Sequence, residues 1–173
     1  MKVKMMSLVM ATVLFFSCGT TYTSTSDNAA YNVKVPTGIR SSFAAQYPDA
    51  ANVVWNNYDV TAVPVDWELV GWAPLDKDDY MVTFNVGSEK YYSWYEADGK
   101  WVGSSYVVTD RSRLPYAVKT ILKDKYDAYT IESIERKTWS NQTAYELKLK
   151  NTDDSTLKLL VDTNGNILKE KAA

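Results

Sequence analysis

The sequence predicts an α+β protein with two tandem repeats, each with one helix packed on a roughly four-stranded antiparallel sheet. The first observation is an internal repeat: laying Pro36 on Pro115 aligns two segments that each carry a tyrosine eleven residues after the proline. The second is the hydrophobic period, which changes from helical to alternating after each of these segments. The third is an Asx-Gly turn that ends at Gly99 and another that ends at Gly165.

Each repeat begins with a helix, expected over residues 35–48 and 114–127. Proline at the first helical position loses no hydrogen bond, so both segments read as helices entered at the proline. We expect Phe84 and Leu122 to be core residues of the first and second repeats. The second helix has apolar side chains at helical spacing, which indicates one face packed on a sheet: Leu114, Val118, Ile121, Leu122 and Tyr126.

After each helix the apolar side chains alternate, as they do in a strand with one buried face. This strand covers residues 80–86 in the first repeat and 145–149 in the second. A further strand, 91–95 or 157–162, then runs into the Asx-Gly turn, a dipeptide typical of a type I′ hairpin. The first repeat differs by an insertion at Val60–Asp79.

The N-terminus reads as a signal peptide, because two lysines precede an apolar run from Met5 to Phe16 that is too short to cross a bilayer comfortably. The lone cysteine, Cys18, follows in a segment that resembles the lipobox of bacterial lipoproteins, so we expect Cys18 to be the lipid attachment site. Ordinary cleavage after the run Ser17-Cys18-Gly19 is the alternative. The expected organisation is a signal peptide at 1–17, a flexible tether at 18–34, the first repeat at 35–108 and the second at 109–173.

Composition excludes several classes of function. The chain has no histidine and one cysteine, so it has no Ser-His-Asp triad, Cys-His dyad, histidine zinc site or intramolecular disulfide. Its 19 basic and 21 acidic residues build no strong positive field, so nucleic acid is not an expected partner. The acidic cluster at residues 76–79 lacks the glycine and glutamate spacing of an EF-hand loop. We expect no metal, no cofactor and no enzymatic activity.

Six motifs occur in order between about Val35 and Lys169: AQYPDAANVVWNNYD, DYMVTFNV, EADGKWV, LPYAVKTILKDKYDAYTIESIE, TAYELKLK and VDTNGNILK. Together they resemble the PepSY-like, beta-lactamase-inhibitor-like domain of secreted and lipid-anchored bacterial proteins. The resemblance implies an extracytoplasmic, non-catalytic module of tandem helix-on-sheet repeats whose exposed sheet binds a protein. It does not extend to inhibition of a beta-lactamase, because the family name rests on fold-level similarity to an inhibitor. The chain departs from the family in the Val60–Asp79 insertion and in having no inhibitor hot-spot motif that matches.

One helix per sheet covers only one face, so the composition of the other face indicates a binding surface. Aligning the two Asx-Gly turns places Tyr92 and Trp94 on that face of the first repeat, together with Met81. Residues 36–108 hold fourteen aromatic side chains and residues 114–170 hold five, so the candidate surface belongs to the first repeat.

The insertion leaves two interpretations of this surface. In one, Trp67 and Trp72 extend an exposed aromatic surface, since rings with polar tips anchor protein interfaces. In the other, the insertion folds back and Trp67 or Trp72 covers Tyr92 and Trp94. The sequence predicts a lipid-anchored binding module of the cell envelope, periplasmic or surface-exposed, that recognises a protein or peptide. A glycan-binding accessory lipoprotein that uses the same aromatic residues is the alternative.

Overall fold

The computed structural model describes residues 33–59, 66–72 and 74–172, apart from the side chains of residues 67 and 68. The predicted signal peptide, Cys18 and most of the predicted tether lie outside the described residues. In chain order the elements are α1 (Thr37–Gln46), β1 (Ala51–Asn57), α2 (Trp67–Val70), β2 (Tyr80–Val86), β3 (Glu89–Tyr95), β4 (Trp101–Val107), the 3₁₀ turn η1 (Arg111–Arg113), α3 (Tyr116–Tyr126), β5 (Thr130–Trp139), β6 (Gln142–Lys150), β7 (Thr156–Asp162) and β8 (Ile167–Ala172).

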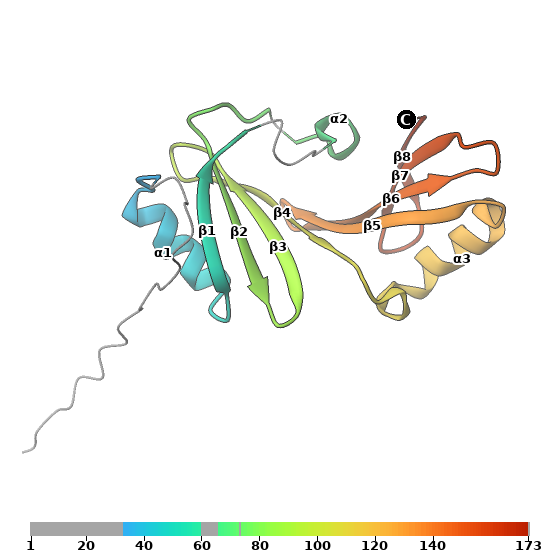
Figure 1. Ribbon diagram of the computed structural model, residues 1–173, viewed down its shortest axis with the longest axis horizontal. Coiled ribbons are helices and arrows are strands. Elements are labelled where there is room, and N and C mark those ends of the chain that lie inside the picture. The colour runs from blue at the N-terminus through green and yellow to red at the C-terminus, as the bar shows by residue number, and fades with distance from the viewer. Residues whose placement is uncertain (1–32, 60–65, 73, 173) are drawn as a thin grey trace, which may run out of the picture.

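The strands form one eight-stranded antiparallel sheet in the order β1 to β8 (Figure 1). The prediction of two tandem repeats, each with a helix on its own sheet, is therefore wrong, and the protein is mostly β. A ladder between β4 and β5, from Ser104 opposite Thr138 to Val107 opposite Glu135, makes the sheet continuous. The physical reason is that two separate meanders would leave unpaired backbone N–H and C=O groups along β4 and β5, which pairing these strands satisfies.

The two longer helices lie on one face of the sheet, which we call the helix face. Each helix is entered at the predicted proline, but Pro36 and Pro115 are the N-cap residues, with ψ of 141° and 144°, and not the first helical residues. The register shows that the face is shared, because Tyr91 of β3 pairs with Tyr106 of β4, which pairs in turn with Arg136 of β5. Figure 1 shows α1 beside β1 at one end of the molecule and α3 along β5 at the other.

The helix face carries two hydrophobic cores. The core under α1 consists of Val35, Ile39, Phe43, Val82, Phe84 and Tyr95. The core under α3 consists of Val108, Leu114, Val118, Leu122, Ile134, Tyr145, Leu147, Leu149, Leu159 and Val161. Phe84 and Leu122 are both buried, so their prediction as core residues is confirmed. The alternation and the helical spacing identified the correct faces because a side chain's direction follows from the local backbone period.

The Asx-Gly turns join strands where the sequence places them, but they are not type I′. Gly99 and Gly165 have φ of 99° and 85°, whereas the Asp and Asn before them have negative φ. A type I′ turn needs positive φ at both central residues. Ser140 and Asn141, between β5 and β6, meet this requirement with φ of 42° and 61°.

A short segment crosses the face of the sheet opposite the helices, which we call the second face. The segment runs from Asp66 through α2 to Trp72, and we call it the strap. Leu69 packs on Leu160 of β7, whereas Trp72 packs on Trp94 of β3. The strap therefore contacts both halves of the sheet. Figure 1 shows α2 between the β1 end and the β8 end of the sheet.

Candidate functional site

The aromatic surface predicted on the second face is a buried cluster. Trp94 is 0% exposed, Met81 5% and Trp72 7%, and the rings of Trp72 and Trp94 lie 5.3 Å apart at 61°. Tyr92 is half-buried beside Trp94. The expectation that Trp94 faces solvent is wrong, because the insertion covers it with Trp72 as the lid. The side chain of Trp67 lies outside the described residues.

Two features hold the strap in place. Gly103 of β4 makes room for the lid, since a Cβ atom there would lie 2.6 Å from Cζ2 of Trp72. At the other end, Oδ2 of Asp66 lies 3.4 Å from Nζ of Lys158. Burial alone would raise the pKa of Asp66, but the backbone N–H of Leu69 and the nearby lysines outweigh it, so this pKa is lowered. The carboxylate therefore stays ionised and attached at neutral pH.

The centre of the second face holds a buried ionic cluster. Lys137 is 0% exposed, and its Nζ lies 3.0 Å from Oε2 of Glu135 and 3.0 Å from Oε2 of Glu146. The hydroxyl of Ser105 donates a hydrogen bond of 2.9 Å to Glu135. Burial raises the pKa of Glu146, although Lys137 partly offsets this effect. The cluster places one cation between two carboxylates, and Lys158 adds a further positive charge near Glu146.

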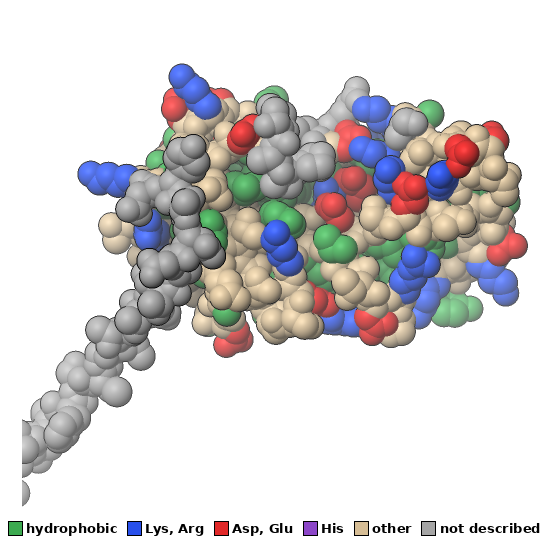
Figure 2. Space-filling view, in the orientation of Figure 1, with side chains coloured by type: hydrophobic (Ala, Val, Ile, Leu, Met, Phe, Trp, Pro, Cys, Tyr) green, Lys and Arg blue, Asp and Glu red, His purple; other side chains and the backbone are tan. Residues whose placement is uncertain are grey.

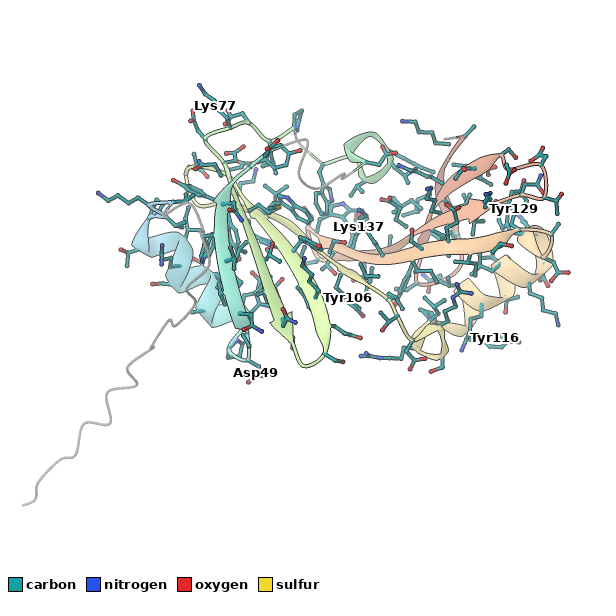
Figure 3. All side chains as sticks on the ribbon, viewed as in Figure 1. Asp49, Lys77, Tyr106, Tyr116, Tyr129 and Lys137 are labelled. Carbon is teal, nitrogen blue, oxygen red and sulfur yellow. The ribbon has the colours of Figure 1, made fainter. Side chains whose placement is uncertain are left out.

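The helix face has a hollow of about 210 Å³ between the two cores. Tyr47 and Tyr91 border the core under α1, and Tyr106 borders the core under α3. Figure 3 shows Tyr106 near the middle of the sheet, between the two helices. We call this site the tyrosine groove, and its lining residues are Tyr47, Tyr91, Ser104, Ser105, Tyr106, Arg136 and Thr138.

Hydrogen bonds fix the α1 side of the tyrosine groove. The hydroxyls of Tyr47 and Ser104 are hydrogen-bonded at 2.6 Å. Ser104 also donates to Oγ of Ser93 at 2.8 Å, and Nε1 of Trp101 donates to the same oxygen at 3.0 Å. Because each of these polar groups is satisfied, the wall is a rigid network on the sheet.

The tyrosine rings of the groove pack against other aromatic rings, and their hydroxyls are neutral. Tyr91 stacks on Phe84 at 5.4 Å and lies 4.6 Å from Tyr106. Burial raises the pKa of Tyr91 to about 12, with smaller contributions from Tyr106 and Glu89. Burial also raises the pKa values of Tyr106 and Tyr47. At physiological pH all three hydroxyls act as hydrogen-bond donors and acceptors and not as acids.

Arg136 supplies the positive charge of the groove. Its guanidinium carbon lies 5.8 Å from the centroid of the Tyr106 ring. Nη1 donates to the hydroxyl of Thr138 at 3.3 Å, and Nη2 donates to the hydroxyl of Thr143 at 3.4 Å. None of the ion pairs formed among the described residues includes Arg136. The half-buried guanidinium thus donates to neutral hydroxyls and has further N–H donors for an external acceptor.

The sequence reasoning missed this groove because it examined the face opposite the helices. A signal for it exists along β5, where the helix-facing positions change from Ile134 to Arg136 and Thr138. Polar residues on a strand face that is otherwise apolar indicate a gap in the core. The gap lies where the cores under α1 and α3 meet.

Charges of both signs are interspersed over the molecule. Figure 2 shows acidic and basic side chains side by side over the β5–β8 half. Within residues 33–59, 66–72 and 74–172 there is no group of three or more Cys, Asp or Glu residues placed to hold a metal ion. Over the same part of the chain, no helix is long and apolar enough to cross a membrane.

Three solved structures from Bacteroides share the fold. A BLIP-like protein from Bacteroides fragilis is 16% identical with a TM-score of 0.65, over 82% of this chain and 88% of that one. A DUF2874 family protein from Bacteroides ovatus is 18% identical with a TM-score of 0.62, over 81% and 89% of the two chains. A Bacteroides eggerthii structure described as "putative periplasmic proteins" is 15% identical with a TM-score of 0.61, over 81% and 90%.

Sequence comparison gives the family. No curated protein matches the chain. The family model described as "Putative beta-lactamase-inhibitor-like, PepSY-like" matches residues 78–169, which is 92 of the 173 residues. This match begins just before β2 and extends into β8, so it includes most of the sheet. The resemblance noted in the sequence is therefore confirmed, and the chain belongs to the PepSY-like, beta-lactamase-inhibitor-like family.

Proposed function

We propose that the protein is a non-catalytic binding module of the cell envelope that recognises a protein or peptide through the tyrosine groove. The observation that carries this proposal is the groove itself, in which three tyrosines and one arginine line a hollow of about 210 Å³. Tyrosine and arginine are the side chains most enriched at interface hot spots, together with tryptophan. Apart from Tyr47 at the end of α1, the lining residues lie on the paired strands β3, β4 and β5, so their side chains are positioned before a partner arrives.

The family supports a binding role. Its description refers to an inhibitor, a class of protein that acts by association, and the similar Bacteroides fragilis protein is described as BLIP-like. The proposal does not extend to a beta-lactamase as the partner, because a fold hosts many different partners.

The proposed location rests on the N-terminal sequence. Residues 1–17 have the pattern of a signal peptide, and Cys18 follows at the position of a lipid attachment site. Residues 18–34 would then tether the folded part to the membrane. The description of the Bacteroides eggerthii neighbour as periplasmic supports an extracytoplasmic location.

The groove replaces the second face as the proposed binding surface. Trp94, Met81 and Trp72 are buried against one another, so they offer no exposed side chain to a partner while the strap is in place. The groove, in contrast, is open on the helix face. A glycan fits the groove less well, because the ring of Tyr91 is already stacked on Phe84 and packed against Tyr106.

Photo-crosslinking in intact cells of the host bacterium tests the proposal. The photoreactive residue p-benzoylphenylalanine at Tyr106 should give a discrete protein adduct, whereas the same residue at Tyr116 on α3, 83% exposed, should not. Thr138→Trp, which fills the groove, should abolish the adduct and leave the thermal midpoint of the protein close to its original value. Equal adduct yields at both positions, or none at Tyr106, would contradict the proposal. An adduct that glycosidase treatment removes would favour a glycan partner.

A further inference from the structure

We infer that the tyrosine groove recognises a carboxylate of its peptide partner and binds it on Arg136. This inference rests on the proposed function, because it names the chemical group that the groove would read. It concerns either an acidic side chain or a chain end, since both present the same carboxylate.

The first argument is that no acidic residue in the described part of the chain forms an ion pair with Arg136. The neighbouring Lys137 has two carboxylates at 3.0 Å, those of Glu135 and Glu146. Among the described residues, Arg136 donates its side-chain hydrogen bonds to threonine hydroxyls, at 3.3 and 3.4 Å. A half-buried charge without a counter-charge is costly to desolvate, and an added carboxylate would offset that cost.

The second argument is that the nearby acid is already engaged. Glu89 at the start of β3 forms an ion pair with Arg113 and accepts a hydrogen bond of 3.3 Å from the hydroxyl of Tyr91. The positive charge of Arg136 therefore remains beside the neutral side chains of Tyr91, Ser104 and Tyr106. A planar guanidinium matches the two oxygens of a carboxylate, which makes arginine suited to this ligand.

The third argument is size. The hollow of about 210 Å³ is smaller than the ~300–1,000 Å³ of typical ligand pockets. It is too small for a helix, which is about 10–12 Å wide with its side chains. The space suits one side chain or one chain end.

Nuclear magnetic resonance with defined peptides tests the inference. The probes are N-acetyl-Ala-Phe with a free carboxylate, the same dipeptide as an amide, N-acetyl-Ala-Glu amide and inorganic phosphate. The free acid should shift the Nε–H resonance of Arg136 in a saturable way and bind at least tenfold more tightly than its amide. A comparable affinity for the Glu-containing amide would show that a side-chain carboxylate also serves.

Variants separate binding from folding. Arg136→Gln should abolish the preference for the acid, whereas Arg40→Gln, at an exposed position of α1, should leave it intact. If Arg136→Gln does not fold, Arg136→Lys keeps the charge but loses the planar fork, and it should weaken binding of the acid by about tenfold.

The outcomes distinguish this inference from the proposed function. Equal affinity for the acid and its amide would overturn carboxylate recognition and leave peptide binding in the groove intact. Tighter binding of phosphate than of the acid would overturn it in favour of a phosphate site. If no probe shifts Arg136, the inference fails, and the crosslink at Tyr106 decides the proposed function separately.

Discussion

Replacement of Lys137 by methionine tests the buried ionic cluster on the second face. Methionine is similar in length, so it keeps the packing and removes the charge. The change leaves Glu146, whose side chain is 13% exposed, without the cation that lies 3.0 Å away. Glu135 loses the same partner, but it is 34% exposed and keeps its hydrogen bond from Ser105.

The expected loss of stability follows from the exposed fractions of the two glutamate side chains. Removing one partner of a fully buried ion pair costs about 3–5 kcal/mol. Because Glu135 has access to water, Glu146 accounts for most of the loss, and we expect the lower end, about 3 kcal/mol. Lys137→Met combined with Glu146→Leu removes the stranded carboxylate and should recover most of the lost stability, since hydrophobic replacements of buried ion pairs are often neutral.

Urea unfolding at pH 7 measures both changes as shifts of the midpoint at constant slope. Burial raises the pKa of Glu146, and without Lys137 this pKa should rise further. A carboxyl group whose pKa is raised by folding costs stability above that pKa, and the cost disappears once the pH falls below its unfolded pKa. The deficit of Lys137→Met should therefore shrink on acidification. A loss below about 1 kcal/mol at pH 7, the range of surface pairs, would refute the reasoning, as would a double variant no more stable than the single one.

Three further predictions concern the anchor, the cores and the lid. Cys18→Ser should release the protein from the membrane fraction and abolish labelling by palmitate; a variant that is still labelled and membrane-bound would exclude this anchor. Phe84→Ala and Leu122→Ala should each cost about 2–5 kcal/mol in urea unfolding, because both side chains are buried, and shifts no larger than those of an exposed substitution would contradict the core assignment. Trp72→Ala should speed solvent exchange of the Trp94 indole N–H, measured by nuclear magnetic resonance, and an unchanged rate would argue against the lid.

Local patterns predicted the elements well. The helices were expected over 35–48 and 114–127 and are found at Thr37–Gln46 and Tyr116–Tyr126. The proline entry and the helical spacing act within one or two turns, so neighbouring residues contain the necessary information. Phe84 was assigned correctly because strand alternation determines which side of the backbone its ring occupies.

Contacts between distant segments were not predictable in the same way. Strand alternation places Trp94 on the second face, but it does not say what covers that face. The lid depends on a contact between Trp72 and Gly103, and neither the helical nor the strand period of the sequence predicts that these two residues meet. The pairing of β4 with β5 likewise joins strands on either side of α3, and Arg136 becomes a candidate site residue only once that pairing brings it beside Tyr106.

The joined sheet has two edge strands, β1 and β8, where two separate sheets would have four. Exposed edges are the places at which neighbouring molecules add strands to one another and aggregate. β8 carries the exposed charged residues Lys169, Glu170 and Lys171, and β1 is irregular near Asn52, which has φ of 53°. Both features discourage edge-to-edge pairing. Such protection matters most for a chain crowded on a membrane surface, as a lipid at Cys18 would make it.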